Sequence, residues 1–86
     1  MMIPDDPFMK DAARAFAKLV ADSDTHAGII QTPEGIEEVA ATIVSIMGGG
    51  AVFSIETAAD LRQAARAGYQ QRLQFLKSIS YRIGGD

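Results

Sequence analysis

Reactive and metal-binding side chains are scarce in this chain, which has no cysteine and a single histidine among its 86 residues. Without cysteine, no disulfide can cross-link the fold and no thiolate can bind a metal or attack a substrate. His26 lies near Asp22 and Asp24 in a polar stretch, but this spacing matches no known class of metal site. We interpret His26 as a solvated loop residue and expect the protein to use no metal and no cofactor.

Nucleotide-binding and catalytic motifs are also missing. Three consecutive glycines, Gly48 to Gly50, are followed by Ala51 and Val52, whereas a P-loop needs a lysine and then a serine or threonine. The same segment lacks the spaced third glycine of the dinucleotide-binding fingerprint. We therefore interpret the glycines as a turn. Because the sequence places no general acid–base pair, we predict that the protein is not an enzyme.

Basic residues are outnumbered by acidic ones, and the two kinds are unevenly distributed. The net charge is −3; residues 1–50 hold eight acids and three bases, whereas residues 51–86 hold three acids and five bases. The five bases do not form one dense stripe, so binding to nucleic acid is disfavoured. The asymmetry can instead guide assembly, either onto a charged partner or head to tail between copies of the chain.

The most uniform apolar stretch, residues 39–55, holds 17 residues without a charge. A membrane-spanning helix needs about 20 apolar residues, with about 17 as the lower limit. No tryptophan or tyrosine stands at either end, and each of the three glycines costs a helix about 1 kcal/mol. We therefore favour a helix, a glycine turn and a short strand. A small single-pass membrane subunit, or a filament- or coat-type subunit using 39–55, stays open as the disfavoured alternative.

The overall composition is that of a single small globular domain. Hydrophobic residues make up 48% of the chain and charged residues 22%. A chain of this size buries only about 60% of its unfolded surface, and a modest core without disulfides often gains stability from a partner subunit. Residues 1–10 lack the basic start and the apolar stretch of a secretory signal, so we expect a cytoplasmic location.

Hydrophobic periodicity predicts a first helix over residues 7–22. Asp6 is a suitable N-cap, and Pro7 suits the first helical position. The expected apolar face holds Phe8, Ala12, Ala15, Phe16 and Leu19. Arg14 and Ala17 are placed on the opposite side of this helix.

A second helix is predicted over residues 33–47, with Thr32 as its cap and Pro33 in its first turn. Three glutamates near its start favour the positive end of the helix dipole. Beyond the first turn the helix is apolar almost all round. We therefore expect it to be the central and most buried element.

A third helix is predicted over residues 57–82, with Thr57 and Asp60 in capping-box spacing, and at 1.5 Å per residue it would be about 39 Å long. The first half of its apolar stripe consists of small residues (Ala64, Ala65, Gly68), and the second half has bulky side chains. Two short strands, over 27–31 and 51–55, are left open beside the helices. The predicted fold class is mainly α: three helices, the last one long, with the two strands as an optional minor component.

The second half of the third helix is the candidate partner interface, because a helix of this length exceeds what so small a core can cover. Arg72 lies within the apolar stripe, so its head either reaches water or meets a carboxylate on a partner, or on a neighbour such as Glu37 or Glu38. The candidate interface residues are Tyr69, Arg72, Leu73, Phe75, Leu76 and Ile79. We predict a small non-enzymatic inhibitor, adaptor or assembly subunit that binds another protein or itself.

Overall fold

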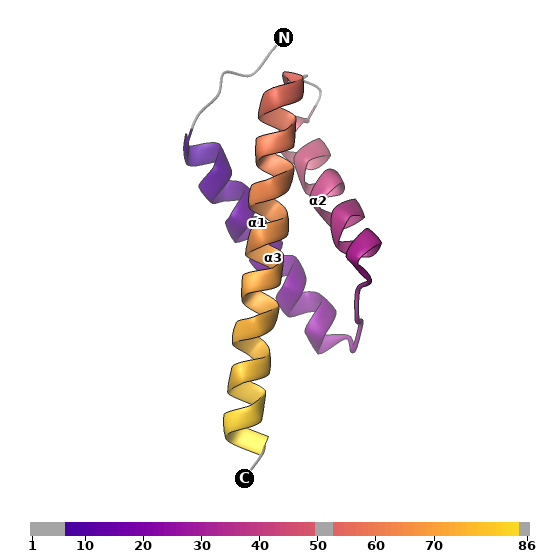
Figure 1. Ribbon diagram of the computed structural model, residues 1–86, viewed down its shortest axis with the longest axis vertical. Helices are drawn as coiled ribbons and strands as arrows, with labels where there is room; N and C mark the ends of the chain where they lie inside the picture. The colour runs from indigo at the N-terminus through magenta and orange to yellow at the C-terminus, as the bar shows by residue number, and fades with distance from the viewer. Residues whose placement is uncertain (1–6, 50–52, 85–86) are drawn as a thin grey trace.

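The computed structural model describes residues 7–49 and 53–84, and its regular structure there is entirely helical. The elements are α1 (Pro7–His26), α2 (Pro33–Gly48) and α3 (Ile55–Gly84). In Figure 1, α3 runs along the long axis of the molecule, α1 crosses behind it, and α2 lies at its side and runs in the opposite direction. The prediction of a mainly α fold with a long C-terminal helix is confirmed.

The end of α1 shows why the strand predicted over 27–31 does not form. α1 continues one turn beyond its predicted end, to His26, and Gly28 follows with a φ of 77° that suits glycine. The N–H of Ile29 donates to the carbonyl of Asp24 at 2.8 Å, and the N–H of Gly28 donates to the carbonyl of Thr25 at 3.1 Å. This pair of bonds is the Schellman arrangement that closes a helix C-terminus. The segment after it turns toward α2 and contains no strand.

The starts of α2 and α3 are set by hydroxyl caps. Thr32 caps α2 as predicted, since its Oγ1 accepts a hydrogen bond from the N–H of Gly35 at 3.0 Å. α3 begins two residues earlier than predicted because Ser54, rather than Thr57, caps it. The Ser54 Oγ accepts a hydrogen bond from the N–H of Thr57 at 3.1 Å and donates one to the Thr57 Oγ1 at 2.8 Å.

Some predictions fall on residues outside the described part of the chain. Asp6, the expected cap of α1, is one of them, and so are residues 51–52 of the strand predicted over 51–55. The remainder of that segment is not a strand, because Ile55 is already the first residue of α3. Across 7–49 and 53–84, no helix combines the length and the apolar character needed to cross a bilayer.

The core lies where the three helices meet, and α3 rather than α2 is the element that packs extensively against both others. The largest fully buried side chains are Ile43 of α2 with Leu61 and Tyr69 of α3. α2 buries only one side, and its Ile46 remains 58% exposed. The prediction that α2 is the central element is therefore wrong. The apolar side chains of α2 extend around more of the helix than α1 and α3 cover.

The contact between α1 and α3 is made by small residues. Ala13, Ala17 and Ala21 of α1 are fully buried, and a Cβ added to Gly68 of α3 would lie 2.7 Å from the carbonyl oxygen of Arg14. The two backbones are thus nearly in contact. The predicted apolar face of α1 is corrected accordingly: Ala17, placed on the outer side, is in the core, whereas Leu19 is 69% exposed.

Candidate interaction surfaces

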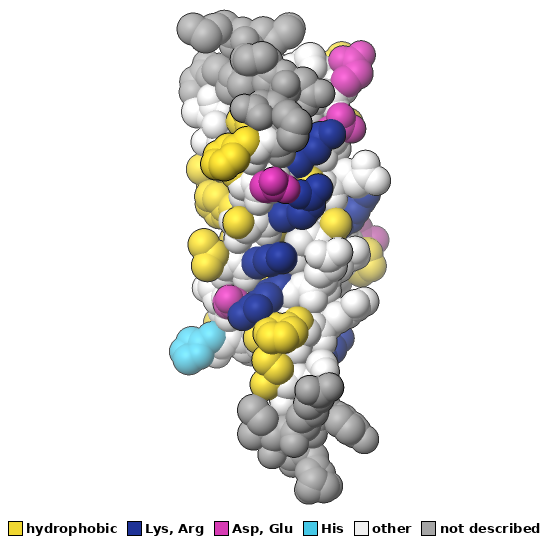
Figure 2. Space-filling view, turned by 90° about the vertical axis from the view of Figure 1, so that its left-hand side faces the viewer, with side chains coloured by type: hydrophobic (Ala, Val, Ile, Leu, Met, Phe, Trp, Pro, Cys, Tyr) yellow, Lys and Arg dark blue, Asp and Glu magenta, His cyan; other side chains and the backbone are white. Residues whose placement is uncertain are grey.

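The C-terminal part of α3 extends past both other helices (Figure 1). We call residues 72–79 the α3 end. Within it Leu73 packs against the core, Phe75 is 49% exposed, and Leu76 and Ile79 are partly exposed. Figure 2 shows hydrophobic side chains gathered just above the C-terminal tip of the molecule, close to a column of lysine and arginine side chains. The α3 end therefore presents a mixed apolar and basic surface.

Arg72 is held in place by its own chain. Its Nε–H donates to the Asp22 Oδ1 at 2.7 Å, and its guanidinium carbon lies 4.7 Å from the centroid of the Phe75 ring. The neighbour is Asp22 rather than Glu37 or Glu38, the examples that we named, and Glu37 is paired with Arg66 of α3. The Arg72 side chain keeps 33% of its surface exposed, so the ion pair lies at the boundary of the core rather than inside it. Arg72 thus lies between Asp22 and the Phe75 ring.

Tyr69 lies in the core and does not belong to the exposed surface that we predicted for it. Its side chain is 1% exposed, and its hydroxyl donates to the Asp24 Oδ2 at 2.7 Å. The Nε2 of Gln31 donates to the same oxygen at 3.2 Å. Burial, followed by the hydrogen bond and the negative charge of Asp24, raises the pKa of Tyr69 above its usual value. Tyr69 therefore joins α3 to the end of α1 and to the connector after it.

An apolar groove adjoins the α3 end. The connector between α1 and α2 exposes Ile29 at 48% and Ile30 at 94%. Together with Leu73 and Lys77 of α3, these side chains line a hollow of about 420 Å³, which we call the connector groove. The connector groove and the α3 end form one continuous surface, because Leu73 and Lys77 belong to both.

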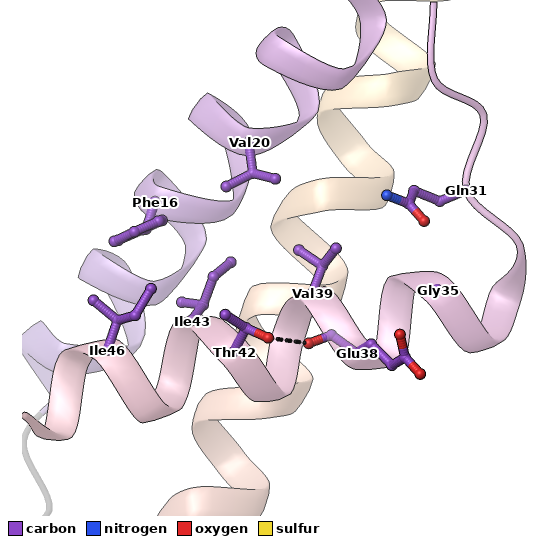
Figure 3. Close-up of a pocket in the computed structure, with 9 residues that line it drawn as sticks. All are labelled: Phe16, Val20, Gln31, Gly35, Glu38, Val39, Thr42, Ile43 and Ile46. Atoms are coloured by element: carbon purple, nitrogen blue, oxygen red, sulfur yellow. Dashed lines mark hydrogen bonds between the residues drawn. The ribbon is translucent and has the colours of Figure 1, made fainter.

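A second groove lies between α1 and α2, on the side of the pair away from α3 (Figure 3). This α1–α2 groove has a volume of about 300 Å³. Phe16 and Val20 of α1 point toward α2, and Val39, Ile43 and Ile46 point back toward them (Figure 3). Glu38 and Thr42 also line the groove. Although both helices pack on α3, they meet each other only loosely, so apolar side chains stay accessible between them.

Our sequence reasoning did not identify either groove. Phe16 and Leu19 did indicate an additional contact surface on α1, because the apolar stripe of this helix is wider than the face that one neighbouring helix covers. We interpreted that stripe as core, and Ala17 as part of the outer side. The connector isoleucines gave a weaker signal, which we interpreted as a strand.

Among 7–49 and 53–84, no group of three or more histidine, aspartate or glutamate side chains could hold a metal ion. Every buried side-chain nitrogen or oxygen in the same residues has a hydrogen-bond partner. His26 is exposed at the end of α1. Comparison with protein-family models, curated proteins and solved structures finds no match for this chain.

Proposed function

We propose that this chain is a small non-enzymatic interaction protein that binds another protein, or a second copy of itself, through the α3 end. The observation that carries this proposal is the exposure of Phe75, 49% of whose surface is accessible on a helix that extends beyond its neighbours. Exposed aromatic side chains on a rigid helix are common anchors of protein contacts. An inhibitor, an adaptor and an assembly subunit would all use such a surface.

The geometry of the α3 end also favours binding because the surface is pre-organised. Arg72 is fixed by Asp22 on one side and lies over the Phe75 ring on the other. Tyr69, one turn earlier, holds the helix against Asp24. A partner that binds here would order few additional side chains, which lowers the entropic cost of association.

Replacing Phe75 by aspartate tests the proposal. We expect Phe75→Asp to abolish self-association, measured by sedimentation equilibrium. Contact with another protein is tested separately, by a photo-crosslinking residue placed at position 75 in the producing cell. Its matched control is Gln70→Asp, an equally acidic change at an exposed position of the same helix. Circular dichroism should show the same helix content for both variants. Unchanged assembly in Phe75→Asp, with equal crosslinking from positions 70 and 75, would contradict the proposal.

A further inference from the structure

The α1–α2 groove has the form of a receptor site for a helix. Two helices form its walls, and its floor is apolar, with Phe16, Val20, Val39 and Ile43 (Figure 3). Ile46 stands at its edge with 58% of its surface exposed. Since α3 covers the opposite side of the same helix pair, a fourth helix bound in the groove would complete a four-helix arrangement.

The charges around this groove indicate what kind of helix would bind. α2 carries three acids and no base. Glu37 is already paired with Arg66, but Glu38 lines the groove and forms no ion pair with the other described residues. The groove thus presents an apolar floor and an acidic edge, which suits an amphipathic helix with basic side chains.

The α3 end of the same chain has these properties. The α3 end, residues 72–79, contains two bases, Arg72 and Lys77, and no acid. Lys77 is exposed and forms no ion pair with the other described residues, and Phe75 supplies an apolar anchor. The α3 end cannot reach the groove of its own copy, because α3 is one continuous helix on the opposite side of α1 and α2 (Figure 1). A second copy is therefore required.

Building on the proposed function, we propose that the α3 end of one copy binds in the α1–α2 groove of another. The contact joins two different surfaces, so it closes into a dimer if it is reciprocal and otherwise continues as a chain of copies. A symmetric contact between two α3 ends would instead place two surfaces that contain bases and no acid against each other, and their like charges disfavour it.

Cysteine crosslinking tests the proposal directly, because the natural sequence has no cysteine. We would mix one variant, Ile46→Cys in the groove, with a second, mass-labelled variant, Ile79→Cys in the α3 end. The expected product after mild oxidation is the mixed 46–79 disulfide. The matched control uses Ala41→Cys, on the exposed side of α2, in place of Ile46→Cys. We expect it to form no 41–79 disulfide.

Two outcomes would overturn this inference, and they differ in what they say about the proposed function. Disulfides that join only position 79 to position 79 would show that α3 ends meet each other, which refutes the groove but retains the α3 end as the contact surface. A monomer at every concentration, with no disulfide, would refute self-association altogether. The crosslinks from position 75 would then decide separately whether another protein binds there.

Charge reversal provides an independent test on folded protein, since both side chains are exposed. We expect Glu38→Lys and Lys77→Glu each to weaken self-association by up to about five-fold, the upper end of the range typical of an exposed ion pair. A variant carrying both changes should recover most of the affinity. Higher salt should weaken the association of the natural chain. Equal association of all four proteins at low salt would overturn the proposal.

Discussion

The two contacts that α1 makes differ in closeness. Against α3 it presents alanines that are fully buried, and Gly68 brings the backbones nearly into contact. Against α2 it presents Phe16 and Val20, and a groove of about 300 Å³ stays open between the helices. Small side chains let two helices approach closely, whereas larger ones need a further layer of side chains to fill the space. The first contact therefore stabilises the monomer, whereas the second is the place where we propose that a partner binds.

Adding one methyl group to the close contact is expected to have the largest effect. In Gly68→Ala the new Cβ would meet the backbone of Arg14, which cannot move aside as a side chain can. We expect a loss of about 1–3 kcal/mol in the free energy of unfolding, measured by urea denaturation. The matched control is Gly35→Ala, where the methyl meets the mobile end of the Gln31 side chain and, at 3.3 Å, the Thr32 Oγ1, but no backbone atom, and a change below about 1 kcal/mol is expected. A more stable Gly68→Ala would show that the helices separate easily.

Alkaline pH is expected to weaken the junction between α3 and the end of α1. Because the pKa of Tyr69 is raised on folding, the folded chain keeps this proton after the unfolded chain has lost it. Its contribution to stability is therefore complete below the usual tyrosine pKa of about 10 and declines as the pH rises above that value. Tyr69→Phe should lose about 1 kcal/mol at neutral pH, through the missing hydrogen bond to Asp24, and should lack this alkaline decline.

Asp24→Asn separates the two causes of the raised pKa. It removes the negative charge but leaves an oxygen that can accept the Tyr69 hydrogen bond. Since burial is the largest cause of the shift, we expect a smaller alkaline decline that does not disappear. Stability measured by denaturation between neutral pH and pH 11 checks both variants. The same decline in Tyr69→Phe as in the natural chain would assign it to other groups.

The sequence was sufficient for the fold class and for the elements with strong terminal signals. Thr32 and Pro33 placed the start of α2 correctly. The sequence also predicted the stripe of small residues on α3, in which Ala64 and Ala65 are buried. These predictions succeeded because capping and short-range periodicity depend on neighbours along the chain.

The orientation of α1 and the burial of Tyr69 could not be predicted in the same way. Hydrophobic periodicity gives most weight to large side chains, whereas a close helix contact selects small ones such as Ala17. Tyr69 was placed at the surface because a tyrosine fits a surface or a core equally well until its hydroxyl has a partner. That partner, Asp24, lies 45 residues away, and no local pattern connects the two.

The smallest effect on the monomer is expected at the open contact. Ile46→Gln changes a side chain that is already 58% exposed, so in dilute protein we expect the free energy of unfolding to stay within about 0.5 kcal/mol of the natural value. At high concentration the natural chain should become more stable, because association in the α1–α2 groove favours the folded form by mass action, and the variant should not. Melting temperatures over a hundred-fold range of concentration measure this difference. If both proteins gain stability equally, association occurs elsewhere, and the open contact between α1 and α2 then has no role in assembly.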